Sequence, residues 1–128
     1  MESITPSLIF FTLASVCNAI MDIIKYKINK SIFLDLNYKV FAWFMSYYEC
    51  KNHYFLNMDG WHTFKALMIT FLILATITFP NNYLSILGIP YLFILYAIIW
   101  GVGFNASYYI IFIKKEFQSE FLNKLGIR

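Results

Sequence analysis

The sequence predicts an all-α, polytopic integral membrane protein with three transmembrane helices and additional amphipathic helices at the membrane interface. The chain is 60% hydrophobic and only 13% charged, whereas a soluble domain carries about 25% charged residues. Two long stretches, 3–21 and 66–113, contain no Asp, Glu, Lys or Arg. Because one span requires about 20 apolar residues, the first stretch predicts one span and the second predicts two spans with a turn. Residues 1–128 are expected to form a single membrane domain.

The first span is expected at about 6–24. Pro6 suits the first helical turn, because the N–H that proline lacks would have no partner there. The second half of the span is more polar, since Ser15, Asn18 and Asp22 recur at spacings of three and four residues. Residues at these spacings lie on one helical face. Polar groups within a membrane usually face the bundle interior, so this face is expected to point toward the other spans.

Two segments outside the spans have amphipathic patterns. In the connection after the first span, 31–48 carries a rough helical stripe of apolar residues and contains no proline. The tail at about 114–125 also has its apolar residues on one face. Both patterns predict helices that lie in the membrane interface. For 31–48, a flat and a re-entrant arrangement both fit.

The second span is expected at about 60–79. Asp59 stands where an N-cap belongs, and its charge favours a helix N-terminus. Lys65 lies near the start and can extend its ammonium group to the headgroups. Pro80, with the two asparagines after it, predicts a stop and a turn.

The third span is expected at about 84–113. Ala97 and Gly101 are four residues apart, as are Gly103 and Ser107. Small residues at this spacing allow helices to approach closely. Both pairs therefore mark candidate contact faces.

The basic residues predict the orientation. All ten lie either between Lys25 and Lys65 or after Ile113, and the turn between the second and third spans has none. Three spans put these two basic regions on the same side, which the positive-inside rule assigns to the cytoplasm. We therefore expect a multi-pass protein of the cell membrane, with the N-terminus outside and the C-terminus in the cytoplasm. Its first partner is the lipid bilayer.

This topology gathers the polar residues of the spans at the inner end of the bundle. At a rise of about 1.5 Å per residue, they fall within the cytoplasmic leaflet or at its edge, whereas the outer half of each span has almost no such groups. They are Asn18 and Asp22 in the first span, Asp59, His62 and Lys65 at the start of the second, and Asn105, Tyr108 and Tyr109 in the third. Since polar groups in a membrane usually face the bundle interior, the simplest interpretation is that these residues share one polar pocket.

Part of this set could bind a metal or transfer protons. Asp59 and His62 share a helix face, and Asp22 adds a carboxylate from the facing helix. Oxygen and imidazole ligands suit a divalent transition metal such as zinc, manganese or iron. Asp22, His62 and Lys65 are then the catalytic candidates, with Lys65 as an anchor for a phosphate headgroup. In the structural alternative, which the single well-placed histidine favours, Asp59 only caps the helix and Asp22 pairs with a lysine.

The remaining polar residues have simpler explanations. Asn18 and Asn105 are expected to form hydrogen bonds between spans, and Tyr108 and Tyr109 are expected to anchor the chain at the interface. The net charge of +3 comes from inner-side lysines. Attraction to anionic lipid explains this charge, so no nucleic-acid partner is expected.

A resemblance rests on three segments, Asn18-Ala19-Ile20-Met21-Asp22, Phe41-Ala42-Trp43-Phe44 and Asp59-Gly60-Trp61-His62-Thr63-Phe64-Lys65. They resemble a group of small, uncharacterised membrane proteins of bacteria and their phages. That group has an N-A-x-M-D motif in the first helix and a D-x-W-H-x-x-K motif that opens a later one. Its loop often carries a Trp and basic residues after a Ser, to which 46–52 is a loose match. The group implies no activity, but it points to the same residues of the first and second spans.

Three functions fit the sequence. The first is a site at the inner leaflet, with or without a metal, that acts on a lipid or its headgroup. The second is an oligomeric pore or holin-like protein, in which small-residue faces join a homo-oligomer, although no span has a continuous polar stripe. The third is a structural or adaptor subunit whose lysine-rich inner surface binds a partner. The sequence favours the first and defines neither a substrate nor a reaction.

Overall fold

The computed structural model describes residues 3–35, 60–83 and 88–126, except for the side chains of 119–121. It contains three long helices, which are α1 (Thr5–Tyr26), α3 (Gly60–Ile77) and α4 (Ile89–Ala106). A π-helical segment, η4 (Ser107–Ile111), continues directly from α4. All three helices, with η4 included in the third, are long and apolar enough to cross a membrane. The predicted all-α class and the number of candidate spans are therefore confirmed.

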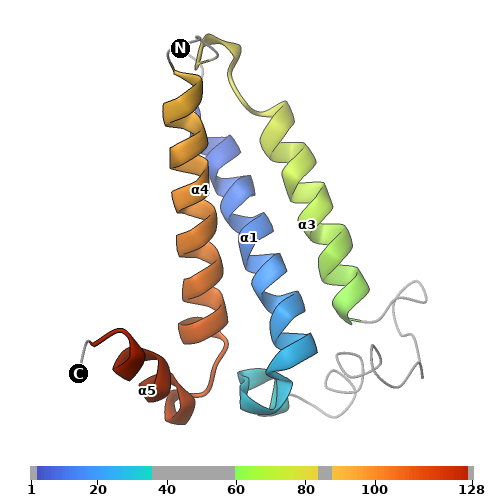
Figure 1. Ribbon diagram of the computed structural model, residues 1–128. Coiled ribbons are helices and arrows are strands. Elements are labelled where there is room, and N and C mark those ends of the chain that lie inside the picture. Colours follow the sequence, from blue (N-terminus) through green and yellow to red (C-terminus); the bar gives the residue numbers. More distant parts are fainter. Residues whose placement is uncertain (1–2, 36–59, 84–87, 127–128) are drawn as a thin grey trace.

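The long helices run alternately up and down the bundle (Figure 1). The N-terminal end of the bundle holds the start of α1, the end of α3, the short turn η3 (Asn81–Tyr83) and the start of α4. The opposite end holds the short turns η1 (Ile28–Lys30) and η2 (Ile32–Asp35), together with α5 (Lys115–Lys124). η2 is the beginning of the predicted interfacial segment 31–48, and the remainder of that segment lies outside the described residues.

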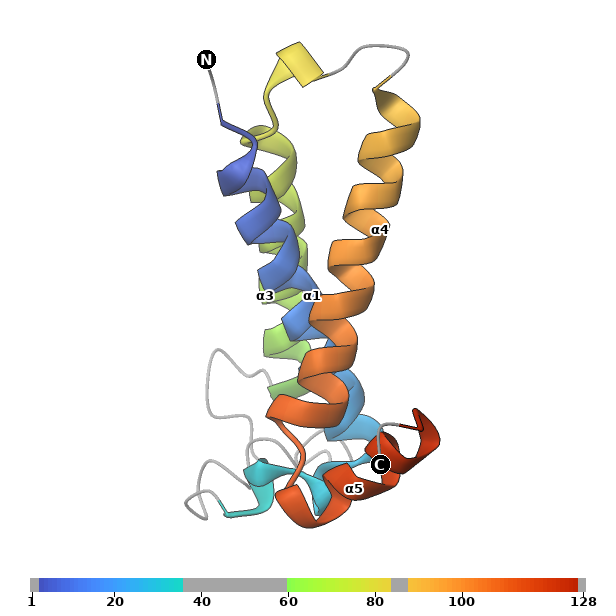
Figure 2. The same cartoon turned by 90° about the vertical axis from the view of Figure 1, so that its left-hand side faces the viewer.

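Helix α1 is the centre of the bundle, with α3 on one side and α4 on the other (Figures 1 and 2). Half of the residues in the most apolar window of α1 are buried, against none in that of α4. Both flanking helices pack on α1, and within the described residues they contact each other little. The outer faces of α3 and α4 are therefore exposed.

Small side chains let α4 approach α1. A Cβ atom at Gly103 would collide with the Ser15 hydroxyl group, whereas Gly101 has open space around it. Ser107, one turn beyond Gly103, is only 1% exposed. The predicted close contact at Gly103 and Ser107 is confirmed. The face of Ala97 and Gly101 is not used in packing within the described chain.

The best-packed core lies at the end opposite the N-terminus. It consists of buried aliphatic and aromatic side chains from α1, the turns after it and the segment after η4, namely Ile20, Ile23, Ile24, Ile28, Phe33 and Ile113. Trp61 and Phe64 of α3 pack against it. Burying each large apolar side chain contributes about 1.5–3 kcal/mol, so this core fixes where α1, α3 and η4 meet.

Backbone and side-chain bonds tie the two segments of this end together. Ile32 N–H donates to the Phe112 carbonyl, and Lys114 N–H donates to the Lys30 carbonyl. The Lys114 ammonium also forms an ion pair with Asp35 at 2.8 Å. The turn after α1 is thereby joined to the segment that leads into α5.

The contact at Gly103 can be tested with a matched pair of alanine substitutions. Gly103→Ala should lower the free energy of unfolding by about 1–2 kcal/mol, because the new methyl group overpacks the contact with Ser15. Gly101→Ala should be neutral or slightly stabilising, since nothing lies within 4 Å and alanine favours a helix. Denaturation in mixed detergent micelles measures both. Adding Ser15→Ala should restore stability to Gly103→Ala, and equal losses at both glycines would contradict the contact.

Candidate functional site

One end of the bundle holds the end of α1 and the beginning of α3 (Figure 1). By their places in these elements, the described lysines belong to this end, which we call the basic end. They are Lys25, Lys27, Lys30, Lys65, Lys114, Lys115 and Lys124. At the N-terminal end, the residues that the structure describes carry no charged side chain. The two ends of the bundle therefore differ sharply in charge, in the way that the sequence predicts.

Lys27 is held by two aromatic rings. Its Nζ lies 4.3 Å from the ring centroids of both Tyr108 and Tyr109. These two rings contact each other edge to face, with centroids 4.7 Å apart. An ammonium group over an aromatic ring gains about 0.5–2 kcal/mol. The contact therefore fixes the Lys27 ammonium between the end of α1 and η4.

Asp22 lies in the same region. It is a half-buried residue of α1, and its carboxylate interacts electrostatically with the Lys25 ammonium and the Tyr108 phenol. We call Asp22, Lys25, Lys27, Tyr108 and Tyr109 the lysine–tyrosine cluster. It combines ammonium groups, a carboxylate and two phenols, and so can attract an anion and donate hydrogen bonds to it.

His62 and Lys65 belong to α3, whereas the residues of this cluster come from α1, the turn after it and η4. Trp61 and Phe64 of α3 face the core, and neighbouring residues of a helix point about 100° apart. His62 is accordingly exposed, with its ring against that of Trp61. Lys65 is also exposed, and its Nζ lies 5.1 Å from the Trp61 ring centroid. The structure therefore places Asp22 with the tyrosines and turns His62 outward.

The predicted metal site has no support among the described residues. In 3–35, 60–83 and 88–126 there is no group of three His, Cys, Asp or Glu side chains that could hold a metal ion. Asp59, the third predicted ligand, lies outside these ranges. The predicted metal site, which would combine Asp22 and His62 with Asp59, therefore stays a prediction.

The two asparagines are placed differently from each other. The Asn105 amide donates to the Gly101 carbonyl of its own helix at 2.7 Å, and its side chain is exposed. The expected bond between spans is thus not formed by this amide. Asn18 is half-buried in α1, and its role between helices stays a prediction.

A second polar group joins all three helices at the N-terminal end, and the sequence did not predict it. The Ser7 hydroxyl of α1 donates to the Ala75 carbonyl of α3 at 2.6 Å, and its oxygen lies 2.6 Å from the Tyr96 hydroxyl of α4. Since serine has one hydroxyl proton, Tyr96 is the donor in the second bond. Each residue is isolated in an apolar helix, so no spacing pattern connects them.

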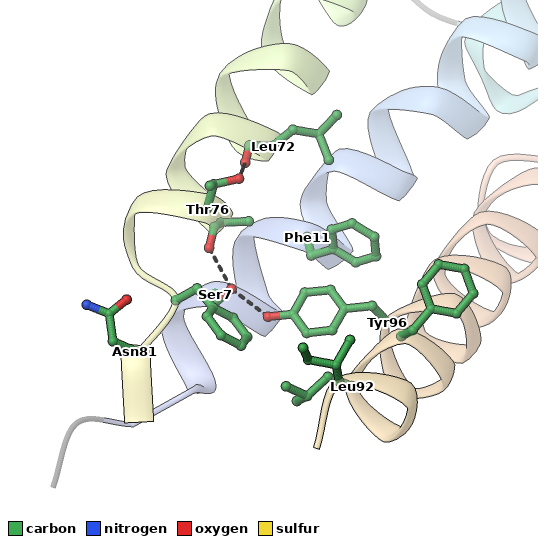
Figure 3. Close-up of a pocket in the computed structure, with 11 residues that line it drawn as sticks. Ser7, Phe11, Leu72, Thr76, Asn81, Leu92 and Tyr96 are labelled. Atoms are coloured by element: carbon green, nitrogen blue, oxygen red, sulfur yellow. Dashed lines mark hydrogen bonds between the residues drawn. The ribbon is translucent and has the colours of Figure 1, made fainter. Parts of the chain in front are cut away.

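These hydroxyl groups line a cavity of about 620 Å³ (Figure 3). Ser7 and Phe11 come from α1, Leu72 and Thr76 from α3, and Leu92 and Tyr96 from α4. The other lining residues are apolar or aromatic except for Asn81. The cavity is therefore an apolar space with a few hydroxyl groups, at the end of the bundle opposite the lysines.

Comparison of the chain with protein-family models, with curated proteins and with solved structures finds no match. The resemblance to small membrane proteins of bacteria and phages stays a prediction. Function is therefore inferred from the contacts at the two ends of the bundle.

The substitution His62→Ala tests directly whether the protein has the predicted metal site. We expect the variant to unfold within about 0.5 kcal/mol of the wild type, because the side chain is exposed and surface substitutions change stability little. We also expect the same transition-metal content in both proteins. Elemental analysis of detergent-purified protein measures this content. A stoichiometric metal that is lost in His62→Ala would contradict this expected equal content and would support a metal site that includes Asp59.

Proposed function

We propose that this chain is an integral membrane protein whose basic end binds the phosphate headgroup of an anionic lipid. The observation that carries the proposal is the Lys27 ammonium, 4.3 Å from two tyrosine ring centroids. A lysine side chain normally loses rotamer freedom when it binds a ligand. Because the rings already hold Lys27, part of this loss has occurred before binding, and the site is pre-organised for an anion.

The surrounding charge supports the same proposal. Lysine is a compact point charge that suits phosphate, and Lys25 and Lys30 lie on either side of Lys27 in the chain. Lys30 lies over the Phe117 ring of α5 at 5.2 Å. The cytoplasmic leaflet is anionic, and each lysine near it contributes about 1 kcal/mol. The Tyr108 and Tyr109 phenols add hydrogen-bond donors.

Asp22 has a distinct place in this proposal. Its carboxylate attracts Lys25 and would repel a phosphate that approached it directly. We therefore assign it the role of orienting a lysine at the rim of the site. If the bound lipid is also chemically changed, Asp22 is the expected proton-transfer group, because it is the half-buried carboxylate of the cluster, whereas His62 is exposed on α3.

A pore is less well supported by the exposed surfaces. Thr70 and Thr76 of α3 donate to the Ala66 and Leu72 carbonyls of their own helix. The exposed residues of α4 up to Val102 are apolar apart from Tyr91. Neither described helix therefore offers a polar stripe from end to end. An adaptor would use the same lysines, and a lipid-binding measurement separates it from the proposed function.

Lys27→Gln should weaken the binding of anionic lipid about fivefold, because it removes one lysine charge that contributes about 1 kcal/mol to the binding free energy. Lys124→Gln on α5, with the same loss of charge, should have a smaller effect. Lys27→Arg should bind like the wild type, because it keeps a cation that stacks on aromatic rings. Native mass spectrometry with phosphatidylglycerol and phosphatidylcholine measures the bound lipid.

Two results would contradict the proposal. One is equal binding of the anionic and zwitterionic lipids by the wild type. The other is an equal loss in Lys27→Gln and Lys124→Gln, which would mean that the charge acts diffusely. The unfolding midpoint of each variant shows whether a loss of binding reflects a loss of structure.

The proposed orientation puts the basic end in the cytoplasm. In a Cys50→Ser background, Ser3→Cys should react with a membrane-impermeant maleimide on intact cells, and Lys124→Cys should react only after permeabilisation. Ser3 and Lys124 are both exposed, and Cys17 is buried. The reverse pattern of labelling would place the lysines outside and remove the anionic inner leaflet from the proposal.

A further inference from the structure

We propose that the cavity at the N-terminal end binds a neutral lipid that carries a hydroxyl group, of the class of long-chain alcohols and diacylglycerols. This site shares no residue with the lysine–tyrosine cluster and lies at the other end of α1. The inference is therefore independent of the proposed headgroup binding. It rests on the size of the cavity, the charge of its lining and the direction of its hydrogen bonds.

The size and lining fit an apolar molecule. Ligand sites usually enclose about 300–1,000 Å³ and combine apolar walls with a few polar groups, and this cavity measures about 620 Å³. The Phe11 and Tyr96 rings meet edge to face at 4.7 Å, and the Phe79 ring lies 6.2 Å from Tyr96. These rings form part of the apolar wall of the cavity.

The absence of charge selects a neutral ligand. None of the lining residues is Asp, Glu, Lys, Arg or His. An ionised headgroup that entered between the helices would give up hydration without gaining a counter-charge. The lining therefore favours a neutral ligand over an anionic or zwitterionic headgroup.

The hydrogen bonds within the lining favour a ligand that donates a hydrogen bond. The Ser7 proton is used by the Ala75 carbonyl, the Tyr96 proton by Ser7, and the Thr76 proton by the Leu72 carbonyl at 2.9 Å (Figure 3). All three hydroxyl protons of the lining thus point to protein atoms. The oxygen atoms of Tyr96 and Thr76 keep lone pairs for an incoming donor. A ligand hydroxyl can donate to these oxygens, whereas an ether or ester oxygen cannot. The Asn81 amide, which does carry donors, is exposed in the turn after α3.

The position of the cavity makes the bilayer the source of the ligand. α3 and α4 each pack on α1 and contact each other little in the described residues, and the cavity between them is open rather than enclosed. With these helices across a bilayer, such an opening faces lipid chains. Asn81, in the turn after α3, also lines the cavity and offers a polar group near the headgroup level.

The test uses the full chain in phosphatidylcholine nanodiscs and a hexadecanol probe with a photoactivatable diazirine in its chain. Unlabelled hexadecanol and hexadecyl methyl ether compete with the probe, and peptide mass spectrometry locates the labelled residues. We expect labelling at residues that line the cavity. We also expect hexadecanol to compete about tenfold better than the ether, since one added hydrogen bond changes affinity by about this factor.

Three variants separate hydrogen bonding from filling of the cavity. Tyr96→Phe keeps the ring but removes one of the two acceptor oxygens, and should lower the preference for the alcohol clearly below that of the wild type. Tyr91→Phe is the matched control, because Tyr91 lies on the same helix, is 76% exposed and does not line the cavity. It should keep the wild-type preference. Leu92→Trp fills the cavity and should suppress labelling without changing the hydroxyl groups.

The outcomes decide the proposal even if one variant does not fold. Equal competition by alcohol and ether in the wild type would overturn the hydroxyl preference without any substitution. Labelling spread over lipid-exposed residues, or labelling that is unchanged in Leu92→Trp, would show that the cavity holds only bulk lipid. A preference for the alcohol in the wild type, together with the loss of labelling in Leu92→Trp, would support the proposed lipid site.

Discussion

Helices that are long and apolar enough to cross a bilayer must satisfy their own polar groups, because hydrocarbon offers no partners. The hydroxyl groups of this chain follow the same constraint. Thr12, Thr70 and Thr76 each donate to the carbonyl four residues earlier. Among the described residues, the polar side chains that contact another element include the Ser7 and Tyr96 pair at one end and Lys27 with its tyrosines at the other. These two groups are the candidates for function.

Composition and charge were sufficient to predict much of the fold. The number of candidate spans follows from the lengths of the uncharged stretches, and the gathering of lysines at one end follows from their places in the chain. The close approach at Gly103 was also predictable, because only small residues permit it. These features depend on averages over many residues or on a steric limit, and both can be read from a sequence.

The sites were less predictable because they depend on the directions of single side chains. α3 is apolar almost all round, so its pattern does not define which face meets α1. The structure turns Trp61 and Phe64 to the core and leaves His62 exposed. The π-helical segment η4 has a similar effect, because a local change in winding sets how Tyr108 and Tyr109 reach Lys27. The cavity joins residues from three helices and has no local signature.

The central place of α1 has a consequence for biogenesis. α3 and α4 follow each other in the chain, yet within the described residues they share little surface and both pack on α1. An α3–α4 pair without α1 therefore buries little surface of its own. α1 precedes both helices in the chain, so it is synthesised before them. The order of synthesis thus supplies the template before the two helices that are assembled on it.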